Sequence, residues 1–311
     1  MTADLAGPVV AVVGPTAAGK SALSLALARA LDGRAEVVNA DSMQLYRGMD
    51  IGTAKLHPDA REGVPHHVLD IWDVTEPASV AAYQRLAREA VDGILARGSV
   101  PLLVGGSGLY VRAVLDEFEF PGTDLALRAS LEAELDAAGP APLHARLREA
   151  DPAAAERILP SNGRRIVRAL EVVTLTGRPF TAELPVPRPV YRAVQLGVDL
   201  DPAALDTRVA TRVTQMWTAG LVDEVRGLAA RGLRTGRTAS RALGYQQVLR
   251  FLAGECTEVD AHAETVRATR RFVRRQRSWF RRDPRIRWLD AAAPDLVVRA
   301  LDATRAGAAV Q

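Results

Sequence analysis

A glycine-rich loop near the start of the chain has the most specific chemistry in the sequence. Residues 14–21 read GPTAAGKS and match G-x4-G-K-[ST], with an apolar run before them and a helical pattern after them. In this context successive amide N–H groups converge on phosphate oxygens, and the helix N-terminus adds partial positive charge. Lys20 provides a cation for the phosphate chain, and the Ser21 hydroxyl is placed to bind Mg²⁺. The predicted phosphate-binding residues are Gly14, Thr16, Ala17, Ala18, Gly19, Lys20 and Ser21.

The phosphate loop does not identify a reaction, and its frequency among proteins favours an ATP-consuming kinase or NTPase. Two features argue against assigning the chain to a kinase or NTPase on this loop alone. No convincing apolar strand ends in an Asp of the kind that holds Mg²⁺ in NTPases, and the segment 41–55 (DSMQLYRGMDIGTAK) is unusual. Asp41 follows an apolar run, so its carboxylate is a metal ligand, an acceptor for a nucleoside hydroxyl or a general base. An Asp that caps a turn is the plain alternative.

The first part of the chain alternates short apolar runs with segments of helical periodicity. The expected strands are 8–13, 35–40 and 100–104, and the expected helices are 20–31 and 80–97. Strands separated by helices form a parallel sheet covered on both faces, and ligands bind beyond the carboxyl ends of its strands. We therefore predict an α/β fold with a P-loop parallel sheet core flanked by helices.

The pattern changes after Leu115. Residues 124–176 are rich in Ala, Leu and Arg at helical spacing, a strand is expected at 191–198, and the rest is mainly helical to about residue 289. We predict three parts: the first part of the P-loop core at 1–117, a helical insertion domain at 118–186, and a core continuation with basic C-terminal helices at 187–311.

Positive charge is concentrated near the C-terminal end. The chain has 311 residues and a net charge of only +3, yet the segment from Glu264 to Trp288 holds ten arginines and two acids. Such segregation indicates a polyanion partner, although a solvated helix face is the plain alternative. A helix is expected over 269–282, with Arg270, Arg274, Arg277 and Arg281 on one face.

The composition excludes several classes of protein. Hydrophobic residues make up 48% and charged residues 25%, an ordinary globular balance. Cys256 is the single cysteine, so no disulfide within the chain and no thiolate zinc cage is expected. No apolar run approaches the roughly 20 residues that span a bilayer, and the first eight residues do not read as a signal peptide. A soluble, cytoplasmic protein with no membrane contact is expected.

Seven segments, in their order along the chain, complete the pattern: GPTAAGKS, DSMQLYRGMDIGTAK, VPHHVLDI, VGGSGLY, NGRRIVRALEV, SRALGYQQ and TRRFVRRQRSWFRRD. Together they resemble the tRNA isopentenyltransferase family, the bacterial tRNA dimethylallyltransferases, from Val9 to about Trp288. The resemblance implies transfer of a dimethylallyl group from dimethylallyl diphosphate to the exocyclic amino group of an adenosine. That adenosine lies immediately 3′ of the anticodon in tRNAs that read codons beginning with U.

The resemblance also implies roles for individual residues. The phosphate loop would hold the donor's diphosphate with Mg²⁺ as cofactor, and Asp41 would take the proton from the adenine amino group. Ser107 and Arg241 would contact the diphosphate near the reacting carbon. The anticodon stem-loop of the tRNA would be contacted by Ser42, Met43, Gln44, Arg164, Arg165, Arg168, Gly244, Tyr245, Gln246, Arg274, Arg277 and Arg281. No obligate protein partner is implied.

The chain departs from the family pattern at four positions. Ala18 stands where Ser is usual, which leaves the backbone amide unchanged, and Ser21 and Ser107 stand where Thr is common, which keeps the hydroxyl. Gln246 stands where Arg or Lys is frequent, which removes one expected phosphate contact.

Three other functions fit part of the sequence. A small-molecule kinase accounts for the phosphate loop alone, and a non-catalytic RNA-binding protein accounts for the arginine-rich segment alone. A prenyl transferase acting on free adenine nucleotides would share the donor site but would not need the insertion.

Overall fold

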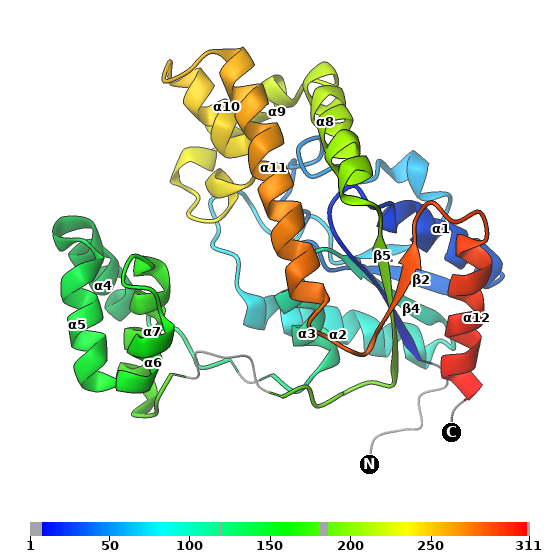
Figure 1. The fold of residues 1–311 in the computed structure, drawn as a ribbon, viewed down its shortest axis with the longest axis horizontal. Helices are drawn as coiled ribbons and strands as arrows, with labels where there is room; N and C mark the ends of the chain where they lie inside the picture. Colours follow the sequence, from blue (N-terminus) through cyan, green and yellow to red (C-terminus); the bar gives the residue numbers. More distant parts are fainter. Residues whose placement is uncertain (1–7, 119, 181–185, 310–311) are drawn as a thin grey trace. The chain divides into compact units, whose positions relative to one another are not determined.

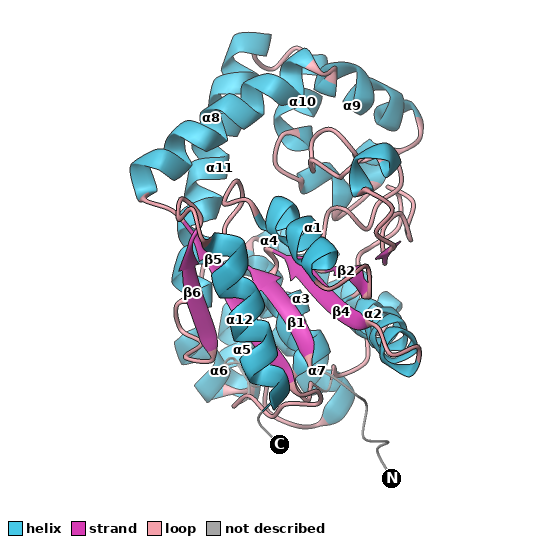
Figure 2. Cartoon of the chain, turned by 90° about the vertical axis from the view of Figure 1, so that its right-hand side faces the viewer, coloured by secondary structure: helices cyan, strands magenta, loops and turns pink. Residues whose placement is uncertain are grey.

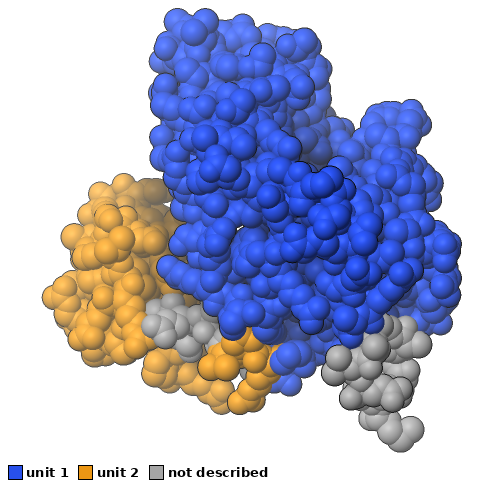
Figure 3. All heavy atoms as spheres, turned by 45° about the vertical axis from the view of Figure 1, so that its right-hand side comes forward, with its two compact units in different colours: residues 1–117, 189–311 blue, residues 118–188 orange. Residues whose placement is uncertain are grey.

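The computed structural model describes residues 8–118, 120–180 and 186–309. Residues 1–7, 119, 181–185 and 310–311 lie outside the described residues. Of the predicted parts of the chain, they include the residues before the first expected strand and part of the C-terminal end of the insertion. The chain divides into two compact units, one formed by 1–117 with 189–311 and the other by 118–188 (Figure 3). The sequence placed the insertion at 118–186.

The larger unit is built on a six-stranded sheet whose pairs are all parallel, in the order β3-β2-β4-β1-β5-β6 (Figures 1 and 2). The strands are β1 (Val9–Val13), β2 (Ala35–Asn39), β3 (His66–His67), β4 (Val100–Gly105), β5 (Ala193–Asp199) and β6 (Ile286–Asp290). β3 and β6 lie at the two edges and were not predicted. The α/β class and the parallel core predicted from the sequence are confirmed.

Helices cover both faces of this sheet because its central strands bury both of their side-chain rows. On β1, Val10 and Val12 pack on one face with side chains of α1, α8 and α12, whereas Val9 and Val13 pack on the other face with α2 and α3. The helices are α1 (Lys20–Ala30), α2 (Val80–Ala96), α3 (Gly108–Leu115), α8 (Pro202–Thr218), α9 (Leu221–Ala230), α10 (Tyr245–Leu252), α11 (Glu258–Phe280) and α12 (Leu296–Ala309).

Helix α11 differs most from its prediction. It begins at Glu258, eleven residues before the expected start at Thr269, because Thr257 and Asp260 form a capping box there. In Figures 1 and 2 it runs from the group formed by α8, α9 and α10 down to the sheet, where Phe280 is buried. None of the described helices is both long enough and apolar enough to cross a membrane.

The smaller unit is helical and has its own core. Its helices are α4 (Leu125–Ala138), α5 (Pro140–Ala150), α6 (Pro152–Arg157) and α7 (Gly163–Thr176). Leu131, Leu147 and Leu170 meet in its apolar centre. Glu171 is fully buried there and pairs with Arg128 and Arg168, which neutralise the buried carboxylate.

Glycines allow three loops to approach closely at the carboxyl ends of the central strands. A Cβ on Gly14 would lie 2.2 Å from the carbonyl oxygen of Val198, and one on Gly105 would lie 2.2 Å from that of Ala40. A Cβ on Gly108 would lie 2.2 Å from the ring of Trp279 on α11. Only residues without a side chain therefore let the loop after β1 approach β5, and let the end of β4 and the start of α3 approach Ala40 and α11.

Gly105→Ala should lower the free energy of unfolding by about 2 kcal/mol or more, because backbone at Ala40 cannot move aside cheaply. Gly227→Ala, in α9 with nothing within 4 Å of the added Cβ, is the matched control. It should stabilise the protein by about 0.5–1 kcal/mol, the helix preference of Ala over Gly. Urea unfolding of both variants measures the difference, and equal midpoints would contradict the packing argument.

Candidate active site

The phosphate loop joins β1 to α1 and curls as the sequence predicts. Gly14 and Gly19 have φ values of +143° and +101°, and Ala17 also has a positive φ of 68°. Glycine adopts such angles without strain. The Lys20 ammonium donates to the carbonyl of Pro15 at 2.8 Å, and the amide of Thr16 donates to Gln276 Oε1 at 2.9 Å. The loop is thus closed on itself and tied to α11.

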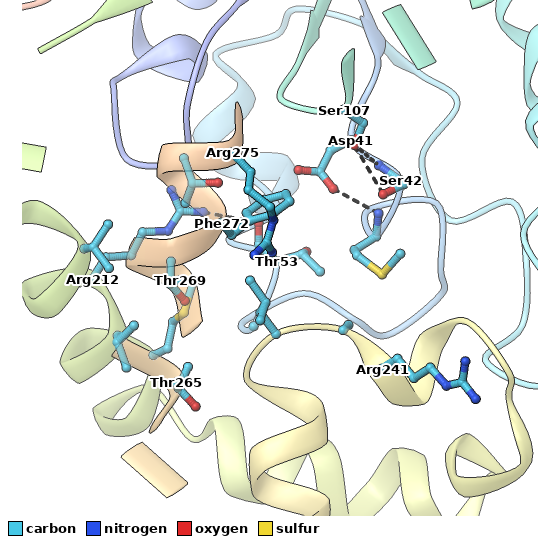
Figure 4. A pocket seen from close by; sticks show the side chains of 18 residues that line it. Asp41, Ser42, Thr53, Ser107, Arg212, Arg241, Thr265, Thr269, Phe272 and Arg275 are labelled. Atoms are coloured by element: carbon cyan, nitrogen blue, oxygen red, sulfur yellow. Dashed lines mark hydrogen bonds between the residues drawn. The ribbon is translucent and has the colours of Figure 1, made fainter. Parts of the chain in front are cut away.

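A cavity of about 320 Å³ lies beyond the carboxyl ends of the central strands. It brings together Thr16 of the phosphate loop, Asp41 after β2 and Ser107 after β4 (Figure 4). Side chains of α8 and α11 form another wall. The cavity is lined by Thr16, Asp41, Ser42, Met43, Gly52, Thr53, Ser107, Val209, Arg212, Val213, Met216, Arg241, Ala242, Leu243, Thr265, Thr269, Phe272 and Arg275.

Asp41 is held rigidly by its own segment. Its backbone amide donates to Asn39 Oδ1 at 2.9 Å, and its Oδ1 accepts from the amide of Met43 at 2.9 Å. Asn39 in turn donates to the carbonyl of Val68 at 3.1 Å. One carboxylate oxygen is therefore used to fix the side chain, and Oδ2 is left for a ligand.

Ser107 and Ser42 connect the loops after β4 and β2. The hydroxyl of Ser107 accepts from the amide of Ser42 at 3.2 Å and donates to the Ser42 hydroxyl at 3.2 Å. Figure 4 shows Asp41, Ser42 and Ser107 gathered on one side of the cavity. The predicted grouping of these residues is present in the structure.

The far end of the acidic segment is fixed by Glu224 of α9. Its carboxylate accepts from the backbone amides of Ile51 at 2.7 Å and Gly52 at 3.3 Å, and from the hydroxyl of Tyr245 at 2.5 Å. A Cβ on Gly52 would lie 2.5 Å from the Tyr245 ring, so the loop rests directly on that ring. This contact positions Thr53 at the cavity.

The cations around the cavity differ from the prediction. Arg241, at the end of a short 3₁₀ turn (Ala239–Arg241), is exposed, and in Figure 4 its side chain points away from Asp41. Arg212 and Arg275 also line the cavity, and neither was predicted as a site residue. The sequence held one indication that Arg212 faces inward. It borders the apolar stripe formed by Val209, Val213 and Met216 of an amphipathic helix.

Burial changes the acid–base behaviour of two cations that Asp41 influences electrostatically. Burial lowers the pKa of Lys20 to about 8, against a raising effect of Asp41 and a further lowering effect of Arg212. Burial also lowers the pKa of Arg212, again opposed by Asp41. Lys20, Asp41 and Arg212 therefore act on one another electrostatically.

The residues predicted to contact RNA fall into different environments. Ser42 and Met43 line the cavity, whereas Gln44 turns away and donates to the carbonyl of Thr53 at 3.2 Å. Tyr245 and Gly244 are buried, so the expectation that they face RNA is corrected: the Tyr245 ring supports Gly52. Gln246 is exposed and lines a polar groove of about 310 Å³ between α10 and α11. Its walls also include Arg250, Arg271 and Arg275.

The predicted arginine face of α11 is held by acids within the protein. Arg277 Nε and Arg281 Nη2 donate to Asp199 Oδ2 at 3.0 and 2.8 Å, and Arg274 Nη2 donates to Asp206 Oδ2 at 2.9 Å. Asp199 ends the apolar strand β5, whereas the sequence offered no convincing strand ending in an Asp of the kind that holds Mg²⁺. The carboxylate at that position binds arginines.

In the smaller unit, Arg164 and Arg165 are exposed on α7. Arg168 instead turns back into that unit, where it donates to Glu171 at 2.6 Å and to the carbonyl of Pro121 at 2.7 Å. Its side chain is still 26% exposed, and its role as an RNA contact stays a prediction.

The metal prediction concerns Ser21, which is exposed in the first turn of α1 and borders a small cavity with Asn39 and Gln44. Over 8–118, 120–180 and 186–309, no group of three or more His, Cys, Asp or Glu side chains is placed to hold a metal ion. A hydroxyl ligand at this position fits an ion whose other ligands come from a bound phosphate.

The fold and the cavity define an α/β protein of the P-loop class, in which an anion-binding loop and a carboxylate face the same volume. A model of the IPP transferase family matches residues 44–283, which is more than half of the chain. The chain belongs to the IPP transferase family.

Individual relatives agree with this assignment. The tRNA dimethylallyltransferase of Salinispora arenicola is 78% identical over 303 residues, covering 97% of this chain and 88% of that protein. That of Salinispora tropica is 75% identical, with 97% and 94% covered. The family resemblance predicted from the seven segments is confirmed.

Solved structures show the same fold. The tRNA isopentenylpyrophosphate transferase of Bacillus halodurans is 38% identical with a TM-score of 0.72, covering 97% of this chain and 96% of that chain. A eukaryotic dimethylallyltransferase acting on tRNA is 26% identical with a TM-score of 0.77, covering 92% and 74%.

The lowered pKa of Lys20 predicts how diphosphate affinity depends on pH. The protonated Lys20 ammonium binds the anion, so the affinity for diphosphate is highest below about pH 8 and falls as the pH rises through that value. Above it, binding must take up a proton, and affinity should fall by up to about tenfold per pH unit. Calorimetric titration with inorganic diphosphate from pH 7 to 10 measures this dependence. The range brackets the pKa of Lys20 in the ligand-free protein, which is about 8.

Lys20→Met is the control, because it removes the ammonium but leaves the ligand's own ionisation. It should bind more weakly at pH 7 and show a flatter profile. Identical slopes in the two proteins would rule out Lys20 as the titrating group.

Proposed function

We propose that this protein transfers a dimethylallyl group from dimethylallyl diphosphate to the exocyclic amino group of the adenosine immediately 3′ of the anticodon, in tRNAs that read codons beginning with U. One observation carries the proposal: the phosphate loop, through Thr16, and Asp41 both line a single cavity. A donor that releases diphosphate and an acceptor that loses a proton can therefore react in the same volume. Membership of the IPP transferase family and the names of its relatives support it.

The donor reacts when its C1–O bond breaks and the electron pair leaves with the diphosphate. The amides of the phosphate loop and the Lys20 ammonium, which here donates to the Pro15 carbonyl, would stabilise that negative charge, and Arg241 at the rim would be a further donor. Mg²⁺ held by Ser21 and the diphosphate oxygens would supply additional charge neutralisation of the leaving group.

The acceptor amino nitrogen uses its lone pair to form the new C1–N bond, and it then loses a proton. Asp41 Oδ2 is suited to take that proton, because Oδ1 is already fixed by the Met43 amide. General-base help of this kind is typically worth about 10²–10⁴-fold. Ser42 and Ser107 support the carboxylate's segment from the other side of the loop.

Recognition of tRNA requires the target base to leave the stack and enter the cavity. In the groove beside Gln246, Arg271 pairs with Glu264 and Arg250 with Glu255, and Arg275 adds positive charge next to the cavity for RNA phosphates. Arg164 and Arg165 on α7 are further candidates. The reaction needs tRNA, a soluble donor and no protein partner, so we place the protein in the cytoplasm, which its single cysteine suits.

Purified protein with Mg²⁺, dimethylallyl diphosphate and a matching tRNA transcript should yield dimethylallyl adenosine at the position 3′ of the anticodon. Mass spectrometry of the tRNA nucleosides measures the product. A transcript with guanosine at that position is the matched control and should remain unmodified, because it lacks the amino group at the reacting position.

Two further reactions separate the alternatives. AMP in place of tRNA should give no product, and ATP should neither be hydrolysed nor compete strongly with the donor. Robust ATP hydrolysis together with unmodified tRNA would refute the proposal in favour of a kinase or NTPase.

Asp41→Ala and Asp41→Asn should lower kcat by about 10²-fold or more, because the amino proton loses its acceptor. Binding of tRNA should stay nearly unchanged, since neither variant removes a cation. Asp302→Asn, on the exposed side of α12, is the control and should keep wild-type turnover. Single-turnover assays with filter binding test both parts, and turnover within tenfold of wild type in the Asp41 variants would show that the base is another group.

A further inference from the structure

Asn39 is a buried polar side chain at the end of an otherwise apolar part of strand β2. It is only 3% exposed. Its Oδ1 accepts from the backbone amide of Asp41 at 2.9 Å, and its Nδ2 donates to the carbonyl of Asp41 at 3.1 Å. One side chain therefore holds both backbone polar groups of Asp41. Because a buried amide is favourable only where its hydrogen bonds are made, this side chain has little freedom to turn.

The carboxylate of Asp41 repeats the same local geometry two residues further along the chain. Its Oδ1 accepts from the amide of Met43 at 2.9 Å, just as the Oδ1 of Asn39 accepts from the amide of Asp41. Side-chain turns of this kind tie a polar side chain to the backbone two residues later. In Figure 4 the Asp41 carboxylate reaches into the cavity with one oxygen held in this bond. The direction of the carboxylate therefore depends on the backbone that Asn39 holds.

The Asn39 side chain is also tied to a strained residue outside this segment. Its Nδ2 donates to the carbonyl of Val68 at 3.1 Å. Val68 has a φ of +61°, in the left-handed region that a β-branched side chain rarely adopts. The chain after it is paired with the acidic segment, where the amide of Ile71 donates to the carbonyl of Leu45 at 2.8 Å. Strain of this kind persists only where the surrounding structure fixes the backbone, so Val68 is a firm support for Asn39.

We propose that Asn39 is a positioning residue that keeps the free carboxylate oxygen of Asp41 directed into the cavity. Asn39 does not line the cavity, so it acts on the reaction through Asp41. The inference rests on the proposed function, because it takes Asp41 as the base of that reaction. Displacement of a reacting group by about 1 Å can cost about 10²-fold in rate, so the support of the base affects turnover directly.

Two substitutions of Asn39 and one control separate positioning from a loss of stability. Asn39→Ala removes all three side-chain hydrogen bonds, whereas Asn39→Ser keeps a short acceptor for the Asp41 amide and loses the reach to Val68. Val91→Ala is the control, since Val91 is fully buried in α2 and does not line the cavity. Single-turnover transfer to tRNA measures the rate. Calorimetric titration with inorganic diphosphate and filter binding of tRNA measure the two affinities.

Asn39→Ala should lower the single-turnover rate by about 10- to 100-fold, because the base is no longer held in place. Its affinities for diphosphate and for tRNA should stay within about threefold of wild type, and Asn39→Ser should lose less rate. Val91→Ala should lower the melting temperature, because it leaves a cavity in the core, and should keep wild-type turnover.

A double variant tests whether Asn39 acts through the base. Asn39→Ala combined with Asp41→Ala should transfer at the rate of Asp41→Ala alone, within about twofold, because the support has no effect once the base is gone. A purely structural role would instead lower the rate of the double variant further.

Hydrogen exchange of backbone amides tests the positioning without turnover. In Asn39→Ala the amides of Asp41 and Met43 should exchange faster than in wild-type protein, because the first loses its acceptor and the second depends on a carboxylate that is no longer fixed. Asn39→Ser should show intermediate exchange at Asp41.

The inference is overturned if Asn39→Ala transfers within twofold of wild type, if the double variant is more than twofold slower than Asp41→Ala, or if both amides exchange as in wild-type protein. If wild-type protein modifies no tRNA, the proposed function is wrong, and faster exchange in Asn39→Ala still supports the positioning of Asp41. The two proposals can therefore fail separately.

Discussion

The side-chain amide of Gln276 joins three distant parts of the chain, and the cavity depends on it. Its Oε1 accepts from the amide of Thr16, and its Nε2 donates to the carbonyl of Gly106, each at 2.9 Å. A Cβ on Gly106 would lie 2.4 Å from that Nε2, so the contact requires a glycine. Because Gln276 is almost fully buried, its two bonds are not exchanged with water. Helix α11 is thereby locked to the phosphate loop and to the loop that carries Ser107.

Electrostatic pairing reinforces this lock and limits what the arginine-rich helix can do. Asp199 at the end of β5 binds Arg277 and Arg281, so α11 is anchored to the sheet on the same side as Gln276. These arginines neutralise a nearly buried carboxylate, and removing both of them would leave that charge uncompensated. Arg275 of the same helix lines the cavity, and its guanidinium lies 5.8 Å from the centre of the Phe272 ring. Some arginines of α11 therefore anchor the helix to the sheet, and others lie at the surface.

Local patterns predicted the parts of the site whose geometry is local. The phosphate loop and Asp41 each follow an apolar strand directly, so their placement required only the strand assignments and the parallel topology. The role of Gln276 could not be predicted, because its partners lie 260 and 170 residues away. Helical spacing correctly placed Arg277 and Arg281 on a common face, but spacing does not reveal that Asp199 packs there. Motif matching carries no burial information, which is why Tyr245 was predicted to face RNA.

The order of the strands explains why a phosphate site and a carboxylate can serve one reaction. β1 carries the phosphate loop, β2 precedes Asp41, and β4, which precedes Ser107, lies between them. Neighbouring strands are about 4.8 Å apart, so the loops after β1 and β2 start about 10 Å from each other. A diphosphate bound at the first loop can therefore present its attached carbon toward Asp41 without any rearrangement of the sheet. Helices α8 and α11 then close the remaining side, and Arg212 and Thr269 reach the same space from opposite helices. The separation of the phosphate loop from Asp41 is set by the spacing of backbone hydrogen bonds, which substitutions in the cavity leave unchanged.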